Sequence, residues 1–257
     1  MLRKRIIFTL IYENGFFNQS RNFRLQKVGN IKWLERNYKF KEIAFSLDEL
    51  IVLNASKKEK NLEEFTKVLN NLVDDVFIPI AAGGGIRTID DAKLLFKNGA
   101  DKLVINSILY ENRELVKNLV QIYGSQSLVA NIDYKKVEGV NRIFINNGTK
   151  ELNVDFNEYI KEIEELAVGE VYLNSIEKDG TGFGYDIETV SSIDKLGIPL
   201  ILAGGAGNEK HLEEGLRLEN VSAVATANLF NFVGDGLPKS RENILNKGIN
   251  IARWLKC

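Results

Sequence analysis

Residues 78–87 read Ile-Pro-Ile-Ala-Ala-Gly-Gly-Gly-Ile-Arg, a short apolar run that leads directly into three glycines. The same pattern returns at residues 198–207, which read Ile-Pro-Leu-Ile-Leu-Ala-Gly-Gly-Ala-Gly. The two stretches lie 120 residues apart, close to half the length of the 257-residue chain. Self-similarity at this spacing predicts two related halves, each with a buried strand, a glycine turn and a helix.

Short β-branched runs alternate with amphipathic segments of helical length along the chain, which is typical of repeated βα units. Near-continuous apolar strands indicate a parallel sheet covered by helices. Eight of them close most naturally into one (β/α)8 TIM barrel, a single domain over residues 1–257 made of two fused half-barrels; an open doubly wound sheet is the alternative. The expected strands are Ile6–Tyr12, Glu49–Leu53, Ile78–Ala82, Lys102–Ile105, Leu128–Asp133, Glu170–Asn174, Pro199–Ala203 and Ala223–Thr226. The expected helices include Ile89–Asn98, Glu114–Tyr123, Asn157–Ala167, Ile187–Leu196 and His211–Leu218.

Two segments interrupt the repeat. Glu13 to Asn30 is expected to be a long loop after the first strand. Val137 to Val154 contains Asn146-Asn147-Gly148 between alternating apolar residues, which favours a small hairpin inserted above the fifth strand.

Composition excludes several classes of protein. The chain has 34 Lys and Arg against 35 Asp and Glu without a long block of one sign, so a nucleic-acid partner is not expected. A single cysteine, Cys257, and a single histidine, His211, argue against a disulfide framework, a His/Cys metal site and a Cys/His nucleophile. We expect neither a metal nor a cofactor. No apolar stretch approaches a membrane span, and the short run Ile6–Tyr12 suits a strand better than a signal peptide, so a cytoplasmic location without membrane contact is expected.

Each glycine cluster would lie at the carboxyl ends of the strands, where barrel enzymes have their active sites. Glycines let the backbone approach an anion closely, and the amino end of the following helix offers free N–H groups. Two such sites on opposite sides of the mouth would suit a small molecule with a phosphate at each end; the alternative is that the glycines only form tight turns. The predicted phosphate-binding residues are Gly84, Gly85, Asn106, Ser107, Gly204, Gly205, Ala227 and Asn228.

Two carboxylates stand at expected strand ends. Asp133 ends the fifth strand, and Asp179 follows the sixth. A carboxylate above an apolar barrel can have a raised pKa and act as an acid or a base, so both are candidate catalytic residues. The alternatives are a turn cap or a lysine partner for Asp133, and an Asx-turn before Gly180 for Asp179.

A third group of charges opens otherwise apolar strands at the opposite end of the barrel. These charges are Arg5, Glu49, Lys102 and Glu170. Two cations and two anions there would pair into a ring that closes the barrel floor, either as a functional element or as a purely structural network.

Short motifs occur in order along nearly the whole chain: Lys4-Arg-Ile-Ile7, Gly83-Gly-Gly-Ile-Arg87, Gly99-Ala-Asp-Lys102, Ile105-Asn-Ser107, Gly124-Ser-Gln126, Gly169-Glu170, Asp179-Gly-Thr181, Gly184-Tyr-Asp186 and Gly204-Gly-Ala-Gly207. Together they resemble the HisF cyclase subunit of imidazole glycerol phosphate synthase, a barrel of the ribulose-phosphate-binding type. The resemblance implies a HisH-like glutaminase partner under the barrel, with Asp101 and Gln126 on the docking surface. It also implies that the four strand-start charges form an ammonia gate, and that ammonia reacts at the mouth with a bis-phosphorylated ribulosyl substrate.

The resemblance also has departures. The family places one aspartate at the end of the first strand, where this chain has Ile11, and another where it has Asp133. A loop lysine of the family is replaced by Gln19, a serine by Ala203 and an aspartate by Asn54. Because isoleucine cannot transfer protons, a mechanism with two carboxylates cannot run in its usual form.

The altered mouth and the intact gate charges resemble the HisF-like branch associated with glycosyl amidation in surface-polysaccharide pathways. The main hypothesis is a barrel that conducts ammonia from a HisH-like glutaminase to a separate sugar amidotransferase, which would make acetamidino sugars. One alternative is a divergent but active cyclase of histidine biosynthesis that uses Asp133 and Asp179. A second alternative is another phosphosugar isomerase on the same barrel.

Overall fold

The barrel strands are parallel, and each pairs with the next barrel strand along the chain. The circle closes because β12 pairs with β1, with Arg5 opposite Ala223. The computed structural model describes residues 3–38, 46–57, 60–228, 231 and 235–253. The barrel strands are β1 (Arg5–Glu13), β4 (Glu49–Asn54), β5 (Ile80–Gly83), β6 (Lys102–Ile105), β7 (Leu128–Val137), β10 (Glu170–Ser175), β11 (Leu200–Ala203) and β12 (Val221–Thr226). The predicted (β/α)8 barrel is confirmed, and the open sheet is wrong.

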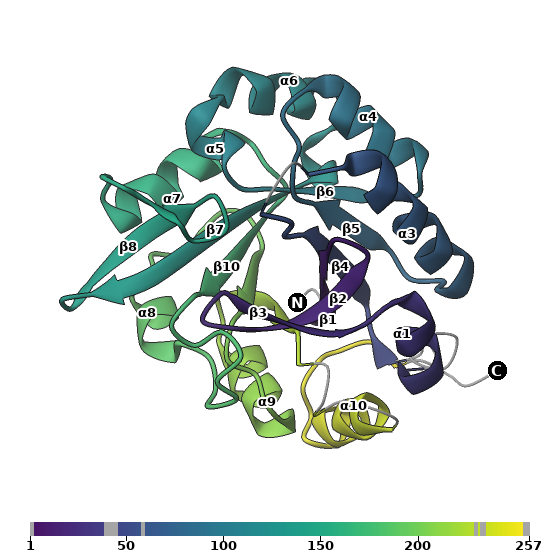
Figure 1. The fold of residues 1–257 in the computed structure, drawn as a ribbon. Helices are drawn as coiled ribbons and strands as arrows, with labels where there is room; N and C mark the ends of the chain where they lie inside the picture. The colour runs from purple at the N-terminus through teal and green to yellow at the C-terminus, as the bar shows by residue number, and fades with distance from the viewer. Residues whose placement is uncertain (1–2, 39–45, 58–59, 229–230, 232–234, 254–257) are drawn as a thin grey trace.

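Helices surround the strands on the outside (Figure 1). They are α1 (Ile31–Tyr38), α3 (Leu62–Asp75), α4 (Ile89–Lys97), α5 (Ile108–Glu111), α6 (Arg113–Tyr123), α7 (Phe156–Glu165), α8 (Ile187–Ser192), α9 (Glu209–Arg217) and α10 (Gly236–Asn246). Helix α9 begins before the expected His211 because the Asn208 side chain accepts the N–H groups of Lys210 and His211. Helix α8 ends at Ser192 rather than at Leu196, since Ile193 is already extended. Among the described residues, none of the helices has the length and apolar character needed to cross a bilayer.

The strands before the glycine clusters begin later than expected. Strand β5 begins at Ile80, two residues late, and β11 begins at Leu200, one residue late. Both follow a proline, which has no N–H to donate. The carbonyls of Pro79 and Pro199 each accept a backbone N–H of the neighbouring strand at 2.9 Å. The two halves of the chain therefore share this proline and its carbonyl hydrogen bond at equivalent positions.

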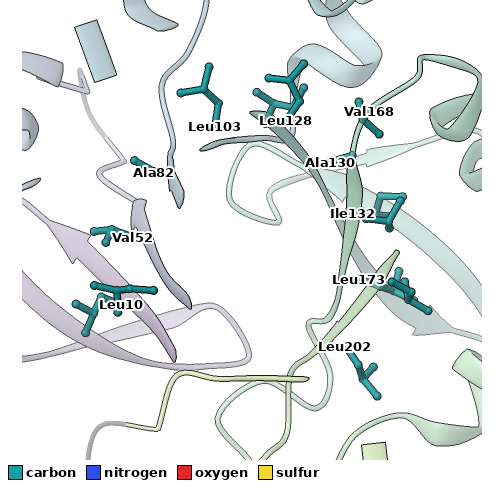
Figure 2. Close-up of a cluster of buried hydrophobic side chains, with 14 of the residues drawn as sticks. Leu10, Val52, Ala82, Leu103, Leu128, Ala130, Ile132, Val168, Leu173 and Leu202 are labelled. Atoms are coloured by element: carbon teal, nitrogen blue, oxygen red, sulfur yellow. The ribbon is translucent and has the colours of Figure 1, made fainter. Parts of the chain in front are cut away.

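Strand alternation divides the core into two layers. Outward-facing residues such as Leu10, Val52 and Leu103 pack between the barrel and its helices (Figure 2). Inward-facing residues such as Ile7 and Val129 fill the middle of the barrel. The inward positions are polar at both ends of the strands. On β10, for example, Glu170, Tyr172 and Asn174 follow one another from the base to the mouth.

The segment expected to be a long loop after the first strand is a hairpin, so that prediction is wrong. Strand β1 continues to Glu13 and pairs antiparallel with β2 (Phe16–Arg21), which pairs with β3 (Arg24–Gly29). Asn14 and Gly15 connect the strands with φ of 47° and 85°. An Asn-Gly turn with two positive φ angles matches the twist of a hairpin, and this signal in the sequence was missed.

The second insertion is a hairpin, as predicted. Strand β7 continues to Val137 and pairs with β8 (Val140–Ile145), which pairs with β9 (Lys150–Leu152). The β7–β8 arm projects beyond the helices (Figure 1).

Candidate functional site

A cavity of about 640 Å³ opens at the carboxyl ends of the barrel strands. Both glycine clusters border it, through Gly84 and Gly85 on one side and Gly204 and Gly205 on the other. The remaining predicted phosphate-binding residues, Asn106, Ser107, Ala227 and Asn228, line the same cavity. The structure therefore brings all eight residues to one space, and phosphate binding itself stays a prediction.

The glycine clusters need glycine for two reasons. Gly84 and Gly204 have φ of 93° and 86°, and Gly85 and Gly205 have φ of 100° and 111°, a conformation that side chains rarely adopt. A Cβ on Gly84 would lie 2.1 Å from the Asn54 carbonyl oxygen. Both halves thus present backbone to the cavity at matching positions, as an anion site requires.

Asp133 lies in this cavity and is held by three side-chain amides. Asn174 donates to its Oδ1 at 3.1 Å, while Asn106 and Asn131 donate to its Oδ2 at 3.2 and 3.3 Å. Burial raises the pKa of Asp133 to about 7, although the hydrogen bonds from Asn174 and Asn131 and the charge of Lys60 oppose the shift. The carboxyl group can therefore give or take a proton near neutral pH. A turn cap and a lysine salt bridge, the alternatives for Asp133, are not the contacts it makes.

Asp179 also borders the cavity, but its side chain is occupied. Its Oδ2 accepts the Ser20 hydroxyl and, at 3.1 Å, the Phe23 N–H, both from the β2–β3 hairpin. Its carbonyl accepts the Asn22 N–H at 2.9 Å. Burial raises the pKa of Asp179, although the hydrogen bonds from the Ser20 hydroxyl and the Phe23 N–H oppose the shift. Asp179 thus fastens the hairpin over the mouth, and a catalytic role for it stays a prediction.

Three of the four departures from the family pattern lie in the same cavity. Ile11, Gln19 and Asn54 line it, whereas Ala203 does not. Gln19 Oε1 is buried without a hydrogen-bond partner among the described residues. The mouth therefore holds an apolar side chain and an unused acceptor at the places where the family has an aspartate and a lysine.

The four strand-start charges form a closed ring at the base of the barrel. Arg5 contacts Glu49 at 2.8 Å and Glu170 at 2.6 Å, and Lys102 contacts the same two carboxylates at 3.0 and 2.7 Å. Burial raises the pKa of Glu49. Burial opposes ionisation of Glu170 as well, yet Arg5 and Lys102 together hold its pKa below the usual range. The predicted ring exists, and its role as a gate stays a prediction.

A further hydrogen bond crosses the barrel between the ring and the cavity. The hydroxyls of Thr9 on β1 and Tyr172 on β10 are 3.1 Å apart and buried. Strands β1 and β10 are separated by β11 and β12 around the barrel, so this bond spans the lumen. Both side chains line the floor of the cavity. The pair therefore lies between the ring and the cavity.

The predicted docking residues lie at the base of the barrel. Asp101 and Gln126 are exposed and stand one and two residues before the starts of β6 and β7, which are neighbours. Asp101 Oδ2 also accepts the Ile80 N–H at 2.8 Å, so it caps the start of β5. The docking role stays a prediction.

Sequence reasoning missed Asn131 and Lys60, and it named Asn174 only as the end of an expected strand. Asn174 stands 120 residues after Asn54, the spacing of the two glycine clusters, so the repeat itself was a usable signal. The repeat does not single out Asn131 or Lys60 in this way. Within the described residues, no group of three or more His, Cys, Asp and Glu side chains is arranged to hold a metal ion.

Comparison with known proteins fits this geometry. A sequence model described as "Histidine biosynthesis protein" matches residues 26–234. A putative imidazole glycerol phosphate synthase subunit hisF2 from Parasynechococcus marenigrum is 46% identical over 256 residues, which cover 99% of this chain and 95% of the relative. HisF subunits of the same synthase from Sulfurisphaera tokodaii and Streptococcus mutans are 34% and 32% identical, over 98% of this chain and at least 99% of each relative. These three names refer neither to a sugar amidotransferase nor to polysaccharide synthesis. The chain belongs to the histidine biosynthesis protein family and is a HisF-like barrel.

Proposed function

We propose that this chain is the cyclase subunit of an imidazole glycerol phosphate synthase. In this proposal, ammonia from a HisH-like glutaminase reacts in the cavity with a bis-phosphorylated ribulosyl ligand. The observation that carries the proposal is the position of Asp133, a carboxyl group that titrates near pH 7, in a cavity bordered by two glycine clusters. The names of the relatives support it as well.

The chemistry follows from the proton that Asp133 holds. Addition of ammonia to a carbonyl carbon and loss of water from the adduct both need a group that gives and takes protons. The three amides fix the Asp133 carboxyl group, so little reorganisation accompanies the transfer. Because Ile11 removes the second carboxylate, Asp133 would carry both transfers.

The base of the barrel supports the route proposed for ammonia. The glutaminase would dock near Asp101 and Gln126, under the ring of Arg5, Glu49, Lys102 and Glu170. Ammonia would cross the ring and then the Thr9–Tyr172 pair to reach the cavity. We infer that this complex works in the cytoplasm.

A second candidate is favoured by Ile11. An isoleucine in the cavity at the place of an acid suits a barrel that conducts ammonia without using it. The ammonia would then pass to a separate sugar amidotransferase that makes acetamidino sugars for surface glycans. The relatives named above favour the first candidate.

The deciding experiment measures turnover of the bis-phosphorylated formimino ribulotide by the purified chain with an ammonium salt. We expect turnover, and a decrease of at least about 10²-fold in Asp133→Asn. Asp235→Asn, at an exposed carboxylate, is the matched control and should retain the wild-type rate.

Circular dichroism would show that both variants are folded. Absence of turnover by folded wild-type protein would overturn the cyclase and favour the amidation role. Glutamine-dependent turnover after addition of a HisH-like glutaminase would test the partner separately.

A further inference from the structure

Lys60 is a cation in the cavity that no family motif predicts. It precedes α3, is partly buried and lines the cavity wall beside the first glycine cluster. A Cβ on Gly85 would lie 3.1 Å from both Cβ and Cδ of Lys60, so the lysine stem packs directly over that glycine. Its ammonium therefore lies where an anion bound by the cluster would need a positive charge.

Among the described residues, the Lys60 ammonium has no carboxylate as a counter-ion. Its Nζ donates to the Asn54 carbonyl oxygen at 3.0 Å, and it forms no salt bridge with a carboxylate of the described residues. Burial, aided by the charge of Arg87 and opposed by that of Asp133, lowers the pKa of Lys60 to about 8. Arg87 itself is paired with Glu111 at 2.7 Å. A partly buried ammonium with one neutral acceptor is unfavourable unless a ligand completes its environment.

Asn54 supplies an independent observation at the same place. Its side chain is 2% exposed and lines the cavity. Asn54 Oδ1 accepts the Ser56 N–H at 3.2 Å, but Nδ2 has no acceptor among the residues described by the structure. A buried N–H donor without a partner typically costs about 1–3 kcal/mol, so its presence in a cavity wall points to an acceptor on a ligand.

We propose that the Lys60 ammonium and the Asn54 side-chain amide complete the anion site of the first glycine cluster, which then binds a phosphate monoester as its dianion. The inference rests on the proposed function, which places a phosphorylated ligand in the cavity. A phosphate fits because its three free oxygens can accept from several directions, from the Gly84–Gly85 backbone and from the two side chains.

The second half of the barrel lacks this arrangement. Lys178 packs over Gly205 with the same 3.1 Å separation that Lys60 has over Gly85, but it does not line the cavity. Asn174 is the residue of the second half that corresponds to Asn54, and its side-chain amide already donates to Asp133. The two phosphate sites are therefore unequal, and the first one carries the extra charge.

The test uses calorimetry to measure the binding of inorganic phosphate to the full chain. Lys60→Gln should weaken one site at least tenfold, as loss of a hydrogen bond to a charged group implies, while Lys60→Arg should retain most of the affinity. Lys67→Gln removes the same charge from the exposed face of α3 and should bind as the wild type does. In protein with carbon-13-labelled lysine, phosphate should also raise the pKa of Lys60.

The outcomes separate the two proposals. Equal phosphate binding by Lys60→Gln and Lys67→Gln, with a Lys60 pKa that phosphate does not move, overturns this inference and leaves the proposed function standing. Absence of phosphate binding by the wild-type chain overturns the inference together with the ligand class of the proposed function. Binding of phosphate with a loss confined to Lys60→Gln supports both.

Discussion

The two ends of the barrel both hold charged and polar groups but satisfy them differently. At the base, each of Arg5, Lys102, Glu49 and Glu170 contacts two partners of opposite charge. At the mouth, Lys60 lacks a carboxylate partner within the described residues, and the buried amide of Asn54 lacks an acceptor there. The base is complete without a ligand, whereas the mouth is arranged to be completed by one.

The pKa directions differ within the base as well as between the two ends. At the base, Arg5 and Lys102 hold the pKa of Glu170 below its usual range despite burial, whereas burial raises the pKa of Glu49. At the mouth, burial is the largest cause of both shifts: it raises the pKa of Asp133 to about 7, and together with the charge of Arg87 it lowers the pKa of Lys60 to about 8. Groups that titrate near neutral pH are found where proton transfer would be needed.

The largest expected effect concerns the pH dependence of stability at the mouth. The pKa of Asp133 is higher in the folded than in the unfolded state. Its contribution to the free energy of unfolding is therefore most favourable below pH about 4 and is lost as the pH rises to about 7. The free energy of unfolding of Asp133→Asn, relative to wild type, should therefore rise across this range by up to about 4 kcal/mol. Urea denaturation at pH 4.5 and 8 (about 25 °C) measures it. A constant difference would show that Asp133 is ionised in the folded state at both pH values.

The second effect concerns the ring of charges at the base of the barrel. Arg5→Met would leave Glu49 and Glu170 to share Lys102, and we expect a loss of about 3 kcal/mol in the free energy of unfolding. Arg217→Met, which removes an exposed pair with Glu213, should lose no more than about 0.5 kcal/mol. Chemical denaturation of both variants gives the comparison. Similar small losses would mean that the ring does not stabilise the fold.

A smaller effect is expected at the second glycine cluster. Gly205→Ala would place a Cβ 2.0 Å from the Gly184 carbonyl oxygen, at a φ of 111°. Gly139→Ala is the matched control, because its φ is 80° but no atom lies within 4 Å of the new Cβ. We expect Gly205→Ala to lose about 2 kcal/mol more than Gly139→Ala in thermal or urea unfolding. Equal losses would show that the close approach at Gly205 can relax.

The smallest effect concerns the hairpin over the mouth. Ser20→Ala removes the hydroxyl that donates to Asp179 but leaves the Phe23 N–H contact in place. Opening of the β2–β3 hairpin should become easier by about 1 kcal/mol, without a comparable change in global stability. Hydrogen exchange of the amides in β2 and β3 measures this. Unchanged exchange would mean that the hairpin is held by its other contacts.

Much of the fold could be predicted because its signals are local. Apolar runs of strand length, glycines after them and amphipathic helices between them indicated the barrel, and the 120-residue repeat indicated its two halves. The antiparallel pairing of β1 with β2 was missed although the Asn14-Gly15 turn between them is a local signal, since an Asn-Gly turn was not considered there. Strand alternation then accounts for the order of Glu170, Tyr172 and Asn174 from base to mouth.

The sequence by itself determined the barrel, the positions of both glycine clusters and the place of Asp133 on the fifth barrel strand. Tertiary structure alone decided what those residues contact. Asp133 is held by amides from β7, β10 and the residue after β6, and Asp179 meets Ser20 across 159 residues of sequence. The burial that moves the pKa values of Asp133 and Lys60 likewise comes from elements distant in the chain. Periodicity places a residue on its own strand or helix, but hydrogen bonds and desolvation depend on which other strands come near it, and only the closed barrel settles that.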